Sequence, residues 1–250
     1  MSQAPTLSPR KPLENTRQLS FWTIALFMTI LPGILFIGAA FYIQESYSAS
    51  REEKNQNLNE WQPLFDGRSL AGWEGKKDVF RVEENAIVAG NLKEKIPNNE
   101  FLCAEKSYRN FELRLKAKLI GEGQNAGIQF RSVRIPNHHE MNGYQCDMGQ
   151  MGDRSIWGAL YDESRRRKFL AQRDKTRTGA ATKKDDWNDL TIRCEEKRIQ
   201  IWLNGYRTVD FMETDDDIRE TGLIGLQIHG GKPAEAWYKD IKIKPLPDHS

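Results

Sequence analysis

The sequence lacks the motifs that mark several common enzyme classes. It has no G-x-S-x-G nucleophile motif, no Walker motif and no dinucleotide-binding glycine fingerprint. The E-x-D-x-x-E pattern, which places the two carboxylates of retaining glucanases on one strand, is also missing. Function therefore has to be inferred from how side chains are distributed along the predicted elements.

Cysteine is scarce, with only 3 among 250 residues. Cys103, Cys146 and Cys194 are odd in number and show no C-x-x-C spacing, which argues against a cysteine zinc site and against a disulfide framework. Each lies among apolar or strand-like neighbours, so we expect buried thiols that pack as small hydrophobic groups. One disulfide with one remaining thiol is the alternative.

One segment lacks charge altogether. Residues 21–43 contain no Asp, Glu, Lys or Arg, and as a helix they would reach roughly 34 Å, enough to cross a bilayer core. We therefore predict one N-terminal transmembrane helix. A cleaved secretory signal is the alternative, because Ser46-Tyr47-Ser48 offers a small-x-small site, but the apolar region of such signals spans only about 7 to 15 residues.

The charges on either side of this segment indicate its orientation. Arg10, Lys11 and Arg17 precede it, whereas Arg51 and Lys54 follow it. The excess on the N-terminal side predicts a cytoplasmic N-terminus and an extracytoplasmic C-terminal domain. The predicted organisation is a cytoplasmic tail (1–20), a membrane anchor (21–43), a polar linker (44–60) and a folded domain (61–247).

The folded domain shows the two-residue period of β-strands and no long amphipathic helix. In Phe111–Leu119, apolar residues alternate with Glu, Arg and Lys, as expected of a strand with one buried face. Asn204-Gly205 between Ile199–Leu203 and Tyr206–Phe211 is a strong hairpin signal. Many short strands without helices predict an all-β domain, an antiparallel sandwich or jelly roll.

Three predicted strands carry unusual residues on their polar side. Ala126–Ser132, Gly143–Gly149 and Leu223–His229 present amides, one Arg, one Asp and one His, where exposed strands usually present Lys, Glu and Thr. The polar set comprises Asn125, Gln129, Arg131, Gln145, Asp147, Gln227 and His229. Such donors and acceptors suit a ligand rich in hydroxyl groups. Gly127 and Gly225 are expected to leave room above the sheet.

We interpret this set as a glycan-sized groove in which Asp147 and His229 share a proton and Arg131 binds an oxyanion. The alternative is an ordinary exposed sheet face, or a group of buried residues that satisfy one another. Trp202 faces away from Ile201 and Leu203 on its strand, so it either stacks on a sugar or covers the sheet.

Two further features are a short His-His-Glu segment and a stretch rich in Lys and Arg. His138-His139-Glu140 follows Pro136-Asn137 in a loop-like stretch and lacks helical metal-ligand spacing, so no metal site is assigned to it. Residues Arg154–Lys184 hold 10 Lys or Arg against 3 Asp or Glu. This stretch is a candidate for binding an anionic polysaccharide or a membrane surface, with a solvated loop as the alternative. Nucleic acid is not expected as a partner outside the cytoplasm.

Six short motifs occur in the order seen in one protein family. The first three are Leu64-Phe65-Asp66-Gly67 together with Gly72-Trp73, then Asn110-Phe111-Glu112-Leu113, then Asn125-Ala126-Gly127-Ile128. The last three are Gly143-Tyr144, then Trp187-Asn188 together with Trp202-Leu203-Asn204-Gly205, then Gly225-Leu226-Gln227-Ile228-His229. Over about Trp61 to Pro247 the chain resembles the 3-keto-disaccharide hydrolase-like domain family, formerly a domain of unknown function. One departure is Gly143-Tyr144-Gln145-Cys146-Asp147, because many members have G-Y-E-x-Q there.

The resemblance implies a concanavalin A-like jelly-roll sandwich, a bacterial envelope location and cleavage of disaccharides already oxidised at C3. A C3 ketone acidifies the proton on C2, so a base can remove it and the C1 substituent can leave. Asp147 and His229 are the expected catalytic residues. The expected substrate-binding residues are Asn125, Gln129, Arg131, Gln145, Tyr161 and Gln227. The cofactor is unknown, with a divalent metal left open.

Two non-enzymatic functions stay open beside this one. The same fold can serve as a glycan-binding module without catalysis, or as a structural protein of the envelope, because family membership does not by itself establish catalysis.

Overall fold

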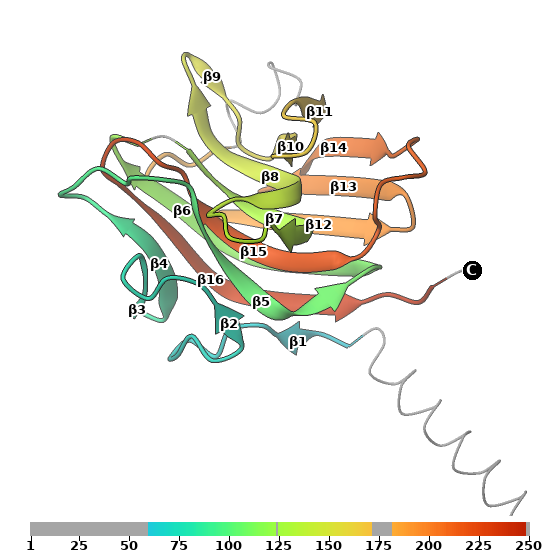
Figure 1. The fold of residues 1–250 in the computed structure, drawn as a ribbon, viewed down its shortest axis with the longest axis horizontal. Helices are drawn as coiled ribbons and strands as arrows, with labels where there is room; N and C mark the ends of the chain where they lie inside the picture. The colour runs from blue at the N-terminus through green and yellow to red at the C-terminus, as the bar shows by residue number, and fades with distance from the viewer. Residues whose placement is uncertain (1–59, 124, 172–181, 249–250) are drawn as a thin grey trace, which may run out of the picture. The chain divides into compact units, whose positions relative to one another are not determined.

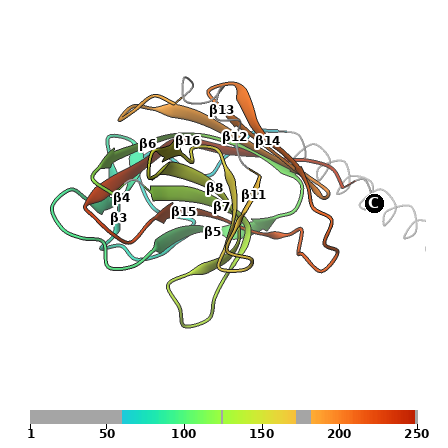
Figure 2. The same ribbon diagram turned by 90° about the horizontal axis from the view of Figure 1, so that it is seen from above.

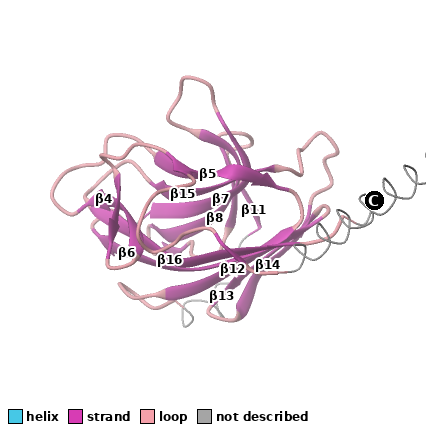
Figure 3. Cartoon of the chain, turned by 90° about the horizontal axis from the view of Figure 1, so that it is seen from below, coloured by secondary structure: helices cyan, strands magenta, loops and turns pink. Residues whose placement is uncertain are grey.

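The structure, a computed structural model, describes residues 60–123, 125–171 and 182–248. These residues form strands and loops only (Figure 3). Accordingly, they include no helix long and apolar enough to cross a membrane. The predicted cytoplasmic tail, the charge-free segment 21–43 and nearly all of the predicted linker lie outside the described residues.

Two antiparallel sheets of eight strands each pack against one another (Figures 1 and 2). Sheet A has the order β14 (Tyr206–Met212), β13 (Arg198–Leu203), β12 (Asn188–Glu195), β6 (Phe111–Gly121), β16 (Ala234–Pro245), β4 (Ala86–Asn91) and β3 (Phe80–Glu83), and β1 (Gln62–Pro63) pairs with β16. Sheet B has the order β11 (Phe169–Ala171), β10 (Leu160–Glu163), β8 (Met141–Met151), β7 (Asn125–Arg134), β15 (Gly222–Ile228), β5 (Glu100–Tyr108) and β2 (Trp73–Glu74), and β9 (Arg154–Ser155) pairs with β8. The predicted all-β antiparallel sandwich is confirmed.

The local patterns form the predicted elements. The alternating segment Phe111–Leu119 lies in β6, where Leu113, Leu115 and Ala117 are buried. Asn204 and Gly205 connect β13 to β14 with φ angles of 48° and 83°. Positive φ at both central positions is the geometry that an Asn-Gly hairpin turn requires.

The main hydrophobic core lies between the sheets and draws side chains from both. Alternation along each strand therefore divides the residues into an inner set in the core and an outer set on the far side of the sheet. All three cysteines are free and buried, as expected, and burial raises the pKa of the Cys103 thiol to about 12. The described strands belong to one compact unit, residues 55–250, with its own core.

Candidate active site

The outer face of sheet B carries most of the polar side chains singled out in the sequence. In β7, Ile128 and Phe130 point into the core, which leaves Gly127 and Gln129 on the outer face. Strand pairing aligns Gln227 of β15 and Asp147 of β8 on either side of Gly127. Gln145 lies opposite Gln129 in the next row. The sheet therefore brings together one carboxylate and three amides from three strands.

These side chains form a directional chain of hydrogen bonds. The Ser132 hydroxyl donates to Gln129 Oε1 at 2.6 Å, and Gln129 Nε2 donates to Gln145 Oε1 at 2.8 Å. Gln145 Nε2 then donates to Asp147 Oδ1 at 2.5 Å. Each amide accepts on one side and donates on the other, so the relay fixes the orientation of every member and ends at the Asp147 carboxyl group.

The room expected above Gly127 and Gly225 is filled by neighbouring side chains. A Cβ atom on Gly127 would lie 2.6 Å from Gln145 Cδ, and one on Gly225 would lie 3.0 Å from Met141 Sδ. The glycines thus clear space for the sheet's own side chains, and Gly127 allows Gln145 to lie across β7 and reach Asp147. Gln129, Gln145 and Asp147 are consequently only 0%, 2% and 4% exposed.

A second carboxylate, Glu163, joins this face from β10. Gln227 Nε2 donates to Glu163 Oε2 at 3.5 Å. Glu140, just before β8, is linked to the same region because the Ser164 hydroxyl donates to its Oε2 at 3.2 Å and Asn99 donates to its Oε1 at 3.0 Å. The sequence analysis predicted Tyr161 of this strand as a site residue and did not predict Glu163. The alternation that places Tyr161 and Glu163 on one side of β10 was the signal available.

The two carboxyl groups at the centre of this face have pKa values raised into the neutral range. Burial is the main cause that raises the pKa of Asp147 to about 8. The hydrogen bond from Gln145 lowers this pKa, and the negative charge of Glu163 raises it. Burial also raises the pKa of Glu163 to about 7, and Glu140 contributes repulsion. At neutral pH Asp147 is therefore mainly protonated while Glu163 is partly ionised, which is the condition for an acid and a base to coexist.

Tyr161 lies beside this pair, opposite Gln145 in the β8–β10 register. Its ring contacts Phe169 edge-on, with 5.1 Å between ring centroids. Burial first, and then the nearby Glu163 and Asp147 carboxylates, raise its pKa. The hydroxyl therefore stays protonated and remains a hydrogen-bond donor at the edge of the site.

Gln227 completes the site with an unsatisfied group. Its Oε1 is buried and has no hydrogen-bond partner among the described residues. A buried amide oxygen without a donor is costly, so it is a position where a ligand hydroxyl would be stabilising.

Arg131 does not join this face, contrary to the sequence prediction. The residue adopts φ = 47°, and the β7–β8 register shifts between Phe130 and Val133. This bulge interrupts the alternation, so the guanidinium is buried elsewhere and donates to the carbonyl oxygens of Arg109 at 2.7 Å and Glu196 at 2.7 Å. With its donors directed at backbone carbonyls, Arg131 joins two loops and is not available to bind an oxyanion.

His229 and Asn125 also lie away from Asp147. His229 follows the end of β15, and its backbone N–H donates to the Asn125 carbonyl at 3.3 Å. This places it one row, roughly 7 Å, beyond Gln227 along the strand. Its Nδ1 lies 2.6 Å from the carbonyl oxygen of Gly230. His229 and Asn125 line a separate cavity of about 220 Å³. The predicted proton sharing between Asp147 and His229 is therefore wrong in this structure.

Two arginines of the basic stretch 154–184 form ion pairs within the protein. Arg165 and Arg166 pair with the buried Asp162, and Arg166 also donates to Glu213 at 2.7 Å. Burial would raise the pKa of Glu213, but hydrogen bonds from Arg166 and Tyr144 lower it to about 2. These arginines stabilise the fold, and residues 172–181 of the stretch lie outside the described structure.

Across residues 60–123, 125–171 and 182–248, no group of three or more His, Cys, Asp and Glu side chains is placed to hold a metal ion. The rings of His138 and His139 stack on each other at 4.3 Å, and Glu140 bonds to Asn99 and Ser164. The described residues thus contain no cluster of side chains suited to a divalent metal ion.

Comparison with solved structures supports this fold. A candidate glycosyl hydrolase from Parabacteroides distasonis is 22% identical with a TM-score of 0.56, over 75% of this chain and 100% of that one. A Bacillus subtilis protein of unknown function with a galectin-like fold is 12% identical with a TM-score of 0.54, over 77% and 97% of the two chains. The exoplasmic/lumenal domain of VIP36, in a form bound to Ca²⁺ and Man3GlcNAc, is 11% identical with a TM-score of 0.54, over 77% and 91%. The TM-scores show a shared β-sandwich fold, and at these low identities the similarity shows the fold alone.

Comparison of sequences identifies the family. No curated protein sequence matches this one. The model of the 3-keto-alpha-glucoside-1,2-lyase-like domain matches residues 60–244, which span both sheets and the polar face of sheet B. The chain belongs to the 3-keto-alpha-glucoside-1,2-lyase-like domain family.

Proposed function

We propose that this domain cleaves 3-keto-glycosides, with Glu163 as the general base and Asp147 as the general acid. The observation that supports the proposal is the pair of carboxyl groups on the outer face of sheet B, with pKa values raised to about 7 and about 8. The family to which the chain belongs provides the reaction class, and the amide relay provides the means of positioning the acid.

The proposed reaction begins with removal of the C2 proton. Ionised Glu163 accepts this proton, and the electron pair of the C–H bond delocalises onto the oxygen of the C3 ketone. Glu163 is suited to the role because its pKa of about 7, against about 8 for Asp147, leaves it the more ionised of the two at neutral pH. Tyr161 donates a hydrogen bond to a sugar oxygen, while Gln227 Oε1, which has no partner among the described residues, accepts one from a sugar hydroxyl.

The second step breaks the glycosidic bond. The enolate electrons form a C1–C2 double bond as the C1–O bond breaks, and Asp147 donates its proton to the departing oxygen. The products are an alcohol and an unsaturated 3-keto sugar. Addition of water across the double bond then returns hydrogen to C2 and hydroxide to C1, so the net reaction is hydrolysis.

The experiment is turnover of 3-keto-sucrose and 3-keto-trehalose in D₂O. Elimination followed by hydration incorporates deuterium at C2 of the 3-keto sugar, whereas direct displacement at C1 does not. Glu163→Gln and Asp147→Asn should each reduce turnover by about 10² to 10⁴-fold. His229→Gln is the matched control and should retain activity because His229 lies in another cavity.

Glycan binding without catalysis is the second candidate function. It is favoured by the fold shared with the VIP36 domain, whose structure is bound to Man3GlcNAc. Saturable sugar binding that is retained in Glu163→Gln, together with no deuterium incorporation by the wild type, would support this function and contradict the lyase proposal.

We further propose that residues 21–43 anchor the domain to a membrane, with the catalytic domain outside the cytoplasm. The support is the charge-free length of this segment and the excess of basic residues before it. Protease added to intact spheroplasts should degrade the domain, and a domain that resists digestion until the membrane is opened would contradict this orientation.

A further inference from the structure

The outer face of sheet A carries tryptophans surrounded by basic side chains. Trp61 has Arg114 at 4.6 Å and Lys242 at 5.2 Å from its ring centroid. On the same side of the sheet, Lys239 lies 4.0 Å from the ring of Trp187. Two further lysines complete the arrangement, with Lys118 lying 4.3 Å from the ring of Trp237 and Lys244 lying 5.6 Å from that of Trp61. We call this set the tryptophan–lysine surface.

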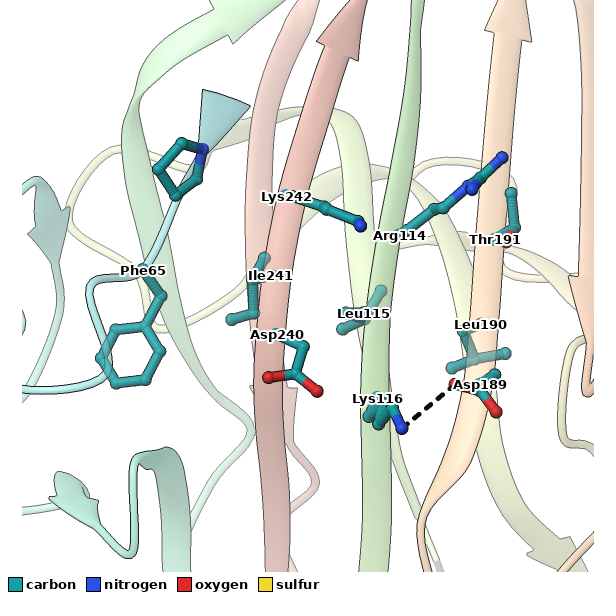
Figure 4. A pocket seen from close by; sticks show the side chains of 11 residues that line it. Phe65, Arg114, Leu115, Lys116, Asp189, Leu190, Thr191, Asp240, Ile241 and Lys242 are labelled. Carbon is teal, nitrogen blue, oxygen red and sulfur yellow. Dashed lines mark ion pairs between the residues drawn. The ribbon is translucent and has the colours of Figure 1, made fainter. Parts of the chain in front are cut away.

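The surface has more positive charge than its own carboxylates neutralise. Arg114 pairs with Glu112, and Lys116 lies 3.8 Å from Asp189 (Figure 4). By contrast, Lys118, Lys239, Lys242 and Lys244 have no carboxylate within 4 Å in the described part of the chain. The exposed Asp240 lines a cavity with Lys116 and Lys242 and also forms no ion pair in the described part of the chain, so four unpaired lysines exceed one unpaired carboxylate on this surface (Figure 4).

An apolar component accompanies the charge. A small hydrophobic cluster separate from the main core contains Ala86, Val88 and Trp237, with Ile120 and Trp187 packed against it. Residues of β6 such as Leu115 and Leu119 belong to the main core, so alternation places Ile120 and Lys118 on the outer face. Aromatic and apolar groups thus lie under and between the lysines.

We infer that the tryptophan–lysine surface binds the headgroups of anionic phospholipids at a bilayer. Tryptophan is enriched where apolar and polar phases meet, and basic residues are attracted to anionic lipid surfaces. A sugar ring fits less well, because stacking needs an open aromatic face and basic side chains already cover these rings. The inference concerns a different face from the proposed catalytic site and goes beyond that activity.

The path of the chain supports a lipid partner. Trp61 directly precedes β1, which pairs with β16, so the polypeptide enters the domain on this surface. Residue 61 is separated from the charge-free segment 21–43 by 17 residues, which span at most roughly 60 Å even when fully extended. A segment 21–43 held in a bilayer would therefore keep residue 61 within roughly 60 Å of the bilayer, a range in which this surface can reach the headgroups.

The consequence for the proposed enzyme is orientation. The outer faces of sheets A and B lie on opposite sides of the sandwich (Figure 2). Contact of sheet A with lipid would leave Glu163 and Asp147 facing away from the membrane, where soluble substrates arrive.

Vesicle sedimentation of residues 55–250, which contain both sheets and the core, tests this inference. Vesicles of phosphatidylcholine alone are compared with vesicles that include phosphatidylglycerol. We expect binding only to the anionic vesicles, weakened by salt. The double variant Lys239→Gln/Lys242→Gln should bind about 25-fold less tightly. Lys77→Gln/Lys106→Gln removes the same charge from exposed positions outside the surface and should bind like the wild type.

Equal binding to neutral vesicles, no binding to either, or equal loss in both double variants would overturn the inference. Binding to soluble polygalacturonate that depends on Lys239 and Lys242, without vesicle binding, would identify an acidic polysaccharide as the partner instead. Turnover of 3-keto-sucrose by the Lys239→Gln/Lys242→Gln variant should match the wild type, so failure of lipid binding and failure of the catalytic proposal are distinguishable.

Discussion

Replacing Asp147 by asparagine should increase stability while it removes activity. Asp147 is 4% exposed, and no Lys, Arg or His side chain of the described residues forms an ion pair with it. Its pKa is raised to about 8 in the folded protein, mainly by burial. In the unfolded chain an aspartate has a pKa of about 3.9. Between about pH 4 and pH 8, Asp147 therefore keeps its proton in the folded state and loses it in the unfolded state.

The sign and size of the effect follow from this difference. A raised folded-state pKa contributes stability that is fully present below about pH 4 and is lost as pH rises to about 8. The loss is about 1.4 kcal/mol per pH unit, or about 4 kcal/mol by pH 7. Asparagine is neutral in both states and keeps an oxygen that can accept from Gln145. We expect Asp147→Asn to be more stable than the wild type by about 2–4 kcal/mol at pH 7.

Urea unfolding near pH 4 and near pH 7, alongside turnover of 3-keto-sucrose, measures both consequences. The variant and the wild type should have similar unfolding free energies near pH 4 and should diverge as pH rises, while turnover falls about 10² to 10⁴-fold. Asp210→Asn is a suitable control because Arg198 lowers the pKa of that exposed carboxylate, so this variant should lose a little stability. An Asp147→Asn protein that is destabilised near pH 7, or that retains turnover, would refute the reasoning.

Three further outcomes are expected. The wild-type kcat/KM should follow a bell-shaped pH profile that rises through about 7 as Glu163 ionises and falls through about 8 as Asp147 loses its proton, and Glu163→Gln should abolish the rising limb. Gly127→Ala places a Cβ against Gln145, so the free energy of unfolding should fall by about 1–3 kcal/mol in thermal unfolding. The displaced Gln145 would no longer donate to Asp147, so the pKa of Asp147 should rise and the falling limb should move to higher pH. Arg166→Met removes the cation that pairs with the buried Glu213, which keeps only its hydrogen bonds from Tyr144 and two backbone N–H groups, and should destabilise by about 3 kcal/mol in thermal unfolding. Arg198→Met, at a more exposed pair, should cost less than about 1 kcal/mol.

The fold could be predicted from the sequence because its signals are local. Alternation in Phe111–Leu119 and the Asn204-Gly205 turn depend on side-chain period and on φ preferences of single residues. The membership of the polar face could be predicted in part for the same reason. Gln129, Gln145, Asp147 and Gln227 share a face once their strands are in register.

The remaining site residues depend on features that alternation does not contain. A bulge at Arg131 redirects its side chain, and no residue type in Phe130–Val133 demands that bulge. His229 continues the alternation of β15 but lies beyond the last paired residue. Glu163 reaches the face through the pairing of β10 with β8, a contact between strands whose partners cannot be identified from their own short sequences.

The Asp147 carboxyl group, buried without a cation on the outer face of sheet B, is itself an argument for function. Such a group reduces stability, as does the unsatisfied Gln227 Oε1, although unsatisfied buried atoms also occur at Asn125, Ser155 and Arg165. Elsewhere the fold pairs its buried carboxylates, as Arg165 and Arg166 do for Asp162. A leucine or a threonine at position 147 would avoid the cost of an ionisable group, so folding alone does not account for the aspartate. Proteins that violate stability rules locally tend to do so where function requires it. The physical cost and the proposed acid–base chemistry therefore point to the same pair, Asp147 and Glu163.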